Sequence, residues 1–326
     1  MSLALSKVAL GCGVFSGAYG DASQDKIELA VRQALKSGIT LFDTSPYYND
    51  SEIKLGKALQ SLRAEYPRSS YHICTKLGRY GYYKKDFDYS AKRVTESVQE
   101  SMRRLHTDYL DIVLCHDVEF VDKEQVLGET LPRLFELKKK GIVRRVGISG
   151  YPLDVLLEIA QAQSAKGEPL DVCLSYCNFN LHCQRLTNYA AKLKAAGVQT
   201  IISASPLSMG LLRQNETPAW HPAKPELKQA VVRCTEHVEK STAELSLAEI
   251  AEHFSFSCTN VDVHLIGAKT KEEVEHALDA YERSQKLRLA SGGKYQNEEH
   301  QLLFEKIMEE LLPFADYTWE SPPADA

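Results

Sequence analysis

The sequence predicts an α/β fold, a (β/α)8 TIM barrel, in a single domain. Two observations support this prediction. From residue 25 onward, apolar segments with helical periodicity alternate with short runs rich in β-branched residues. Eight runs have the character of strands, and eight is the number that closes a parallel barrel. These runs span residues 8–11, 40–43, 71–76, 109–116, 144–149, 170–176, 200–203 and 263–267.

The helices between the strands have their own start and stop signals. We expect helices at residues 25–37 and 129–140, each followed by a glycine, and at 90–105, where Ser90 is a capping residue. Residues 214–226 contain three prolines and predict a long loop that folds over a cofactor. An amphipathic helix near residues 298–312 completes a barrel domain of residues 1–312. We expect residues 313–326 to form a flexible tail.

An open, doubly wound sheet is the alternative architecture. Its nucleotide-binding signature is G-x-G-x-x-G directly after the first strand. The chain has Gly11 and Gly13 at that place, but the next glycine is Gly17, which is the wrong spacing. The glycine pattern therefore favours the barrel.

The composition of the chain narrows the classes of molecule that the protein is expected to bind. The net charge is -5 and the charged residues form no basic stripe, so we expect small molecules rather than nucleic acid or a membrane surface. No secretory leader and no apolar run of about 18 residues is present, which predicts a cytoplasmic protein. Most of the eight cysteines lie in apolar runs, typical of buried thiols. The group of Cys173, Cys177 and Cys183 fits no common zinc spacing, and we expect no metal site.

Polar residues stand at the carboxyl ends of three predicted strands. Asp43, Lys76 and His116 each end a strand, and Tyr48 lies in the loop after Asp43. Alone, each residue has an ordinary role as a turn, surface or loop-packing residue. Active sites of such barrels lie at this end, so a carboxylate, an ammonium, an imidazole and a phenol should converge there.

This set suits proton-coupled hydride transfer. A phenol has an unperturbed pKa near 10, so the Lys76 ammonium must favour the phenolate if Tyr48 is to exchange protons near neutral pH. We expect Asp43 to keep Lys76 charged, and His116 to hydrogen-bond the reacting oxygen. Two other chemistries use the same barrel. One makes Lys76 a Schiff-base nucleophile, and the other is serine hydrolysis, although Ser149 lacks the G-x-S-x-G spacing.

The motifs FDTSPYY, TKLG, RLHTDYLDIVLCHD, VGISGY, ASPLSMGLL and IGAKTKEEVEHALDAYE, in this order, resemble the aldo-keto reductase family over nearly the whole chain. The resemblance implies that Tyr48 is the acid/base, Lys76 its pKa modifier, Asp43 the partner of Lys76, and His116 the residue that polarises the substrate. It also implies that Ser149 holds the nicotinamide carboxamide. The other cofactor contacts expected from it are Gly11, Asp43, Ser175, Ser205, Leu207, Gly210, Gly267, Lys269 and Glu273.

The motifs HDVEFV, SGYPLD, LSYCNFNL and WHPAKPEL are similar to the sugar 1-dehydrogenase branch, which includes D-arabinose and L-galactose dehydrogenases. This similarity implies oxidation of the anomeric carbon of D-arabinose, or of L-galactose or L-fucose, to a lactone, on routes to ascorbate or erythroascorbate. D-arabinose is favoured because residues 62–81 look more like that enzyme. The alternatives are an L-galactose dehydrogenase, a general NADP-dependent reductase and a non-catalytic channel subunit. The family implies a monomer or a dimer.

The cofactor is expected to be NAD rather than NADP. NADP-using relatives generally place an arginine where this chain has Glu273, and a carboxylate there repels a 2′-phosphate but accepts a hydrogen bond from a 2′-hydroxyl. Lys269 offers some compensating charge, and Glu273 could instead be a solvated helix residue. Other departures are Gly150 in place of an asparagine and Ala204 in place of the aromatic that stacks on nicotinamide. The expected sugar contacts are Tyr48, His116, Phe15, Arg79 and Trp220, with Tyr80 and His221 as further candidates.

Overall fold

Eight parallel strands form a closed barrel in the computed structural model, which describes residues 4–17, 20–213 and 217–320. Each strand pairs with the next along the chain, and β8 pairs with β1, so the sheet has no open edge. The barrel prediction is therefore confirmed and the open doubly wound sheet is excluded. Predicted and observed strand bounds differ by no more than two residues. The strands are β1 (Val8–Gly11), β2 (Leu41–Asp43), β3 (His72–Leu77), β4 (Leu110–Cys115), β5 (Val143–Gly150), β6 (Val172–Tyr176), β7 (Thr200–Ala204) and β8 (Val263–Gly267).

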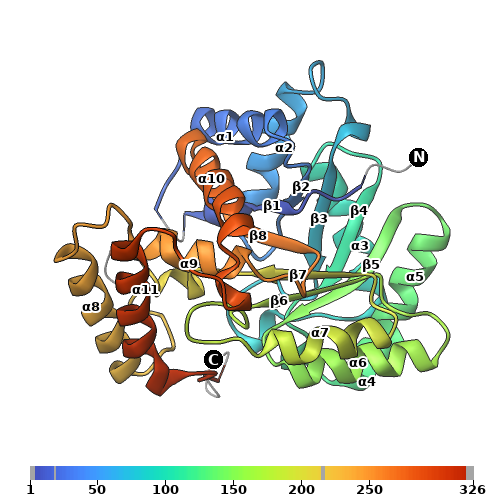
Figure 1. The fold of residues 1–326 in the computed structure, drawn as a ribbon. Helices are drawn as coiled ribbons and strands as arrows, with labels where there is room; N and C mark the ends of the chain where they lie inside the picture. Colours follow the sequence, from blue (N-terminus) through green and yellow to red (C-terminus); the bar gives the residue numbers. More distant parts are fainter. Residues whose placement is uncertain (1–3, 18–19, 214–216, 321–326) are drawn as a thin grey trace.

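Helices surround the barrel on its outer face (Figure 1). Ser90 caps α3 as expected, since its hydroxyl accepts the Arg93 N–H. The helix expected at residues 129–140 instead begins at Leu131, because a π-helical segment, Val126–Thr130, precedes it. The α-helices are α1 (Gln24–Lys36), α2 (Ser51–Ser61), α3 (Ala91–Arg104), α4 (Lys123–Gln125), α5 (Leu131–Lys139), α6 (Leu153–Ala165), α7 (Leu186–Ala195), α8 (Pro225–Glu239), α9 (Leu247–Phe256), α10 (Lys271–Leu287) and α11 (Glu298–Leu311).

Alternation along the strands divides the core into two layers. One apolar cluster fills the barrel, and it contains Leu41, Cys74 and Leu114. A larger cluster lies between the strands and the helices. Side chains two residues apart on a strand share a face. Asp43 and Lys76 therefore continue the inner rows of Leu41 and Cys74 at the carboxyl end of the barrel.

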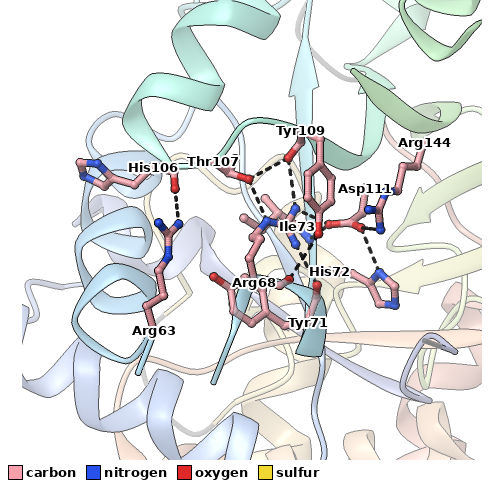
Figure 2. A network of polar contacts seen from close by, with 10 residues as sticks. All are labelled: Arg63, Arg68, Tyr71, His72, Ile73, His106, Thr107, Tyr109, Asp111 and Arg144. Carbon is pink, nitrogen blue, oxygen red and sulfur yellow. Dashed lines mark hydrogen bonds and ion pairs between the residues drawn. The ribbon is translucent and has the colours of Figure 1, made fainter. Parts of the chain in front are cut away.

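The amino end of the barrel carries a polar network centred on Asp111 of β4 (Figure 2). The buried carboxylate accepts hydrogen bonds from Arg68 at 2.5 Å, from the Ile73 backbone N–H at 3.0 Å and from Arg144 at 3.3 Å. His72 Nδ1 lies 3.3 Å from Asp111 Oδ1, the oxygen that also accepts from Arg144. Burial alone would raise the pKa of Asp111, but the bond from His72 and the charge of Arg68 outweigh it and lower that pKa. This network connects β3, β4 and β5 at the end opposite to Lys76.

The end of the described chain packs against the barrel. Trp319 is 8% exposed and stacks on Tyr151, with ring centroids 5.4 Å apart and planes 10° apart. The expectation of a flexible tail is therefore not met for residues 313–320, whereas residues 321–326 lie outside the described chain. The predicted loop at 214–226 also falls partly outside it, at residues 214–216, and α8 begins at Pro225. Across the ranges that the structure describes, no helix has the length and apolar character needed to cross a membrane.

Candidate active site

A buried ion pair lies at the carboxyl end of the barrel. Lys76 Nζ donates a 2.6 Å hydrogen bond to Asp43 Oδ2 and a 3.0 Å hydrogen bond to the carbonyl oxygen of Thr44. Strand β2 ends at Asp43, and Lys76 lies near the end of the neighbouring strand β3, so strand pairing brings the two side chains together. Both side chains are almost fully buried, so the surrounding protein shields the ion pair from water.

Tyr48 and His116 meet this pair. The Tyr48 backbone N–H donates to the carbonyl oxygen of Ser45 at 3.0 Å, and this turn directs the chain back over the rim. Lys76 Nζ lies 4.9 Å from the centroid of the Tyr48 ring, and the His116 ring packs edge-on against the same ring at 5.6 Å. The four residues predicted as catalytic are thus brought together in one place.

Burial and charge set the protonation of this group. Burial raises the pKa of Tyr48 above its usual value, and the Lys76 ammonium opposes the rise without overcoming it. The expected lowering of the Tyr48 pKa is therefore wrong in its net direction, although the lysine acts with the expected sign. Burial would lower the pKa of Lys76, but Asp43 outweighs it and raises that pKa. The amine stays an ammonium, which argues against a Schiff-base nucleophile.

His116 is a neutral imidazole at neutral pH. Burial, together with the charges of Lys76 and Arg79, holds the pKa of His116 well below its usual value. A neutral ring offers one N–H donor and one lone pair. His116 can therefore hydrogen-bond a reacting oxygen without carrying a positive charge itself.

The residues predicted to hold the cofactor lie around the same end of the barrel. Gly11 and Gly267 pair at the ends of β1 and β8, and a Cβ on Gly11 would lie 2.9 Å from the Ile266 carbonyl oxygen. Ser149 near the end of β5 is buried, and its hydroxyl donates to the Cys115 carbonyl oxygen at 3.3 Å. The segment after β7 supplies Ser205, Leu207 and Gly210.

Ser175 is placed differently from the expectation. Leu174 and Tyr176 belong to the cluster inside the barrel, and Cys173 belongs to the outer layer. Alternation therefore turns Ser175 toward the helices, where its hydroxyl accepts a 2.9 Å hydrogen bond from Asn178 Nδ2. The structure does not bring Ser175 into the barrel mouth.

The start of α10 carries the two residues predicted to select the cofactor. Thr270 caps the helix, since its hydroxyl accepts the Glu273 backbone N–H at 3.2 Å. Glu273 Oε2 in turn accepts the Lys269 backbone N–H at 2.7 Å. Lys269 Nζ donates to the Gly20 carbonyl oxygen at 2.8 Å. Glu273 is therefore an exposed residue of α10, and its carboxylate closes the first turn of the helix.

The residues predicted to contact the sugar divide into two groups. Arg79 lies beside the catalytic group, where it donates to Asp117 and to the Tyr47 hydroxyl. Phe15 is 0% exposed and belongs to the outer core, so its prediction as a sugar contact is wrong. Trp220 is 51% exposed, and its ring stacks on His221.

Sequence reasoning missed Asp117 and Tyr47. Asp117 Oδ2 lies 3.6 Å from His116 Nε2 and accepts the Arg79 hydrogen bond at 2.6 Å. The Tyr47 ring packs edge-on against His116 and lies 3.8 Å below the Arg79 guanidinium. Asp117 directly follows His116 and Tyr47 directly precedes Tyr48 in the sequence, and this adjacency could have indicated that both lie at the site.

Two buried side-chain oxygens bear on which cofactor fits this site. Asp43 Oδ1 and Asn178 Oδ1 are buried without a hydrogen-bond partner among the described residues. Buried acceptors of this kind are costly unless a donor reaches them. Ribose hydroxyls and a carboxamide NH2 are such donors, so the residues present fit a nicotinamide nucleotide. Among the described residues no cluster of metal ligands is found, and Cys173, Cys177 and Cys183 are buried free thiols.

Comparison with known proteins agrees with this geometry. A family model described as "Aldo/keto reductase family" matches residues 7–287. The chain belongs to the aldo/keto reductase family. It is an oxidoreductase that acts on CH–OH groups, and members of this family use nicotinamide cofactors.

Two similar relatives are dehydrogenases of sugars. An L-galactose dehydrogenase from Arabidopsis thaliana is 39% identical over 280 residues, which cover 85% of this chain and 85% of the relative. A D-arabinose 1-dehydrogenase from Saccharomyces cerevisiae is 39% identical over 284 residues, which cover 85% and 83%. The holo form of an aldo-keto reductase from Bacillus halodurans superposes with a TM-score of 0.65 over 98% of this chain and 95% of its own, at 21% identity. This last likeness concerns the fold.

Proposed function

We propose that this protein is an NAD-dependent aldose 1-dehydrogenase, which oxidises the anomeric carbon of D-arabinose or a related sugar to the lactone. The observation that carries the proposal is the buried group of Asp43, Lys76, Tyr48 and His116 at the barrel mouth. The two relatives named as sugar dehydrogenases support the substrate class. Because these relatives are named as dehydrogenases, the alternative of a non-catalytic subunit is less favoured.

The residues of the chain divide the chemistry between them. Tyr48 acts as a phenolate that takes the proton of the anomeric hydroxyl at its phenolic oxygen, and the Lys76 ammonium stabilises this phenolate before the proton is transferred. Asp43 keeps Lys76 charged and directed toward Tyr48. His116 hydrogen-bonds the oxygen that changes charge. A bound nicotinamide would supply the hydride acceptor.

The charges at the start of α10 support NAD over NADP. Glu272 and Glu273 both lie in the first turn of this helix, and Glu273 is held in place by its bond from the Lys269 backbone. Two carboxylates at a helix start repel a 2′-phosphate, and one of them can accept a hydrogen bond from a 2′-hydroxyl. The ammonium of Lys269 donates to the Gly20 carbonyl oxygen, which directs it toward the loop after β1.

D-arabinose is the proposed sugar, with L-galactose as the main alternative. The pyranose rings of these sugars share the stereochemistry of their corresponding hydroxyls and differ mainly in a hydroxymethyl group on C5. A pocket distinguishes a group of that size by only about 1–3 kcal/mol. We therefore expect both sugars to react, at rates that differ by less than about 200-fold.

Steady-state kinetics test the proposal. The values of kcat/KM would be measured for D-arabinose, L-galactose and L-fucose, each with NAD and with NADP. We expect NADH formation with D-arabinose, and a loss of at least about 10²-fold in Tyr48→Phe. The same change at the exposed Tyr82 is a matched control that should leave the rate unchanged. If no aldose yields NADH or NADPH, or if Tyr48→Phe keeps the full rate, the proposal is refuted.

A further inference from the structure

The two ring nitrogens of His116 face different partners. Nδ1 lies 3.0 Å from the hydroxyl oxygen of Ser45, and Nε2 lies 3.6 Å from the Asp117 Oδ2 carboxylate oxygen. The ring is neutral, so one nitrogen carries the hydrogen and the other carries a lone pair. The neighbours of the two nitrogens decide which tautomer forms.

The Ser45 hydroxyl is compatible with either tautomer of the His116 ring, whereas the Asp117 carboxylate is compatible with only one. The Ser45 hydroxyl already accepts the Tyr47 backbone N–H at 3.1 Å, and it can still donate to Nδ1 or accept from it. An ionised Asp117 has only lone pairs to present. A lone pair on His116 Nε2 would be repelled by that carboxylate, whereas an N–H there would be attracted. The 3.6 Å contact is too long for a hydrogen bond, so the N–H remains available to a substrate oxygen. The hydrogen therefore belongs on Nε2, and Ser45 donates to Nδ1.

Arg79 is the cation that pairs with the Asp117 carboxylate and favours its charged form. Its guanidinium donates to Asp117 Oδ2 at 2.6 Å and to the Tyr47 hydroxyl at 3.0 Å, and it packs on the Tyr47 ring. Burial raises the pKa of Asp117, and Arg79 opposes that rise. Nearby Glu119 has a pKa raised to about 8 by burial and by Asp117, and its Oε1 accepts the Tyr151 backbone N–H at 3.0 Å.

The backbone at Asp117 provides a clean test. Its φ is 53°, in the left-handed region that aspartate and asparagine tolerate better than most residues. Asp117→Asn therefore keeps the backbone preference and the shape of the side chain and removes the charge.

We infer that Asp117 and Arg79 are positioning residues that fix His116 as an Nε2–H donor toward the reacting oxygen of the sugar. A preset donor stabilises negative charge on that oxygen without giving up its proton. The other tautomer would present a lone pair to the same oxygen. The catalytic meaning of this inference rests on the proposed function, whereas the tautomer is a property of the chain alone.

Nuclear magnetic resonance of protein labelled with 15N-histidine reads the tautomer directly, from long-range 15N–1H correlations. His116→Gln assigns the signal by its disappearance. We expect the Nε2–H form in the wild type and a shift toward the Nδ1–H form in Asp117→Asn. We also expect kcat for aldose oxidation to fall about 10–100-fold in Asp117→Asn, with KM changed less than about threefold.

Two further variants make the result specific. Asp122→Asn makes the same chemical change at an exposed helix cap in the same loop, and it should alter neither the spectrum nor kcat. Ser45→Ala should keep the Nε2–H form, because Asp117 dictates it. This second variant also answers the question if Asp117→Asn fails to fold.

Three results would overturn the inference. The first is a wild-type His116 with its hydrogen on Nδ1, and the second is a change of tautomer in Ser45→Ala. The third is an Asp117→Asn protein with an unchanged spectrum and a raised KM, which would make Asp117 a sugar contact instead. If no aldose is oxidised at all, the proposed function fails, and the spectra still decide whether Asp117 sets the tautomer.

Discussion

The Lys76→Met substitution removes one positive charge from the centre of the site and keeps most of the apolar side chain. The ammonium lies 4.9 Å from the centroid of the Tyr48 ring. With an effective dielectric constant of about 20, two unit charges at this separation interact with about 3 kcal/mol. That energy favours the phenolate of Tyr48 over the phenol. Its loss lowers the phenolate population, and with it the rate of oxidation, by on the order of 10²-fold.

The same substitution has a structural cost. It leaves the Asp43 carboxylate buried without the partner that now lies 2.6 Å away. Breaking a buried pair in this way destabilises a protein by about 3–5 kcal/mol. The double variant Asp43→Asn/Lys76→Met removes both charges, so we expect it to regain most of the free energy of unfolding but none of the activity.

The assay compares kcat for aldose oxidation over about pH 6–10 with the free energy of unfolding from urea denaturation. We expect both variants to lose about 10²-fold in kcat near neutral pH and to keep this deficit while kcat rises with pH, because the pKa of Tyr48 is raised above its usual value in the wild type as well. Recovery of kcat in the double variant would show that Lys76→Met acts through folding. A single variant within about threefold of the wild type would refute the electrostatic reasoning altogether.

Three further predictions concern Tyr48, Asp111 and Glu273. Because burial raises the pKa of Tyr48, oxidation, which needs the phenolate, should increase with pH through the neutral range, and a flat kcat profile would contradict this. Asp111→Asn should lower the free energy of unfolding at pH 7 by roughly 2–4 kcal/mol. Folding lowers the pKa of Asp111, so the stabilising contribution of its carboxylate is present above its unfolded pKa of about 3.9 and is lost as the pH falls through the folded value. Urea denaturation near pH 3 should therefore show a smaller difference in the free energy of unfolding between the wild type and Asp111→Asn. Glu273→Arg should raise the ratio of kcat/KM for NADP over NAD by at least about tenfold, and an unchanged ratio would contradict the role of this carboxylate.

The strands and the catalytic group could be predicted because they depend on local patterns. Apolar runs of strand length and helical periodicity are properties of neighbouring residues, and they located all eight strands to within two residues. The positions of Asp43, Lys76 and His116 at strand ends then required only the parallel barrel to bring them together. Their inward direction follows from alternation with Leu41, Cys74 and Leu114.

The wrong predictions concern side chains whose burial, direction or pKa is set by segments that are distant in the sequence. Phe15 directly follows β1, so its sequence position suggested a ligand contact, but it lies in the short 3-10 helix Cys12–Ser16 and is completely buried in the outer core. Ser175 was one residue out of phase with the inner face of β6. The rise in the pKa of Tyr48 depends on how many atoms surround the phenol, and no sequence pattern reports that.

Hydrophobic periodicity and strand ends are encoded over short stretches of chain, so they sufficed to predict the barrel, the order of its strands and the four residues at its mouth. The tertiary structure decided which charges pair and which rings stack. Arg79 and Asp117 are 38 residues apart, and Tyr151 and Trp319 are 168 apart. Such contacts depend on how whole strands and loops pack in space, and packing alone sets the burial that governs the protonation of Tyr48 and His116.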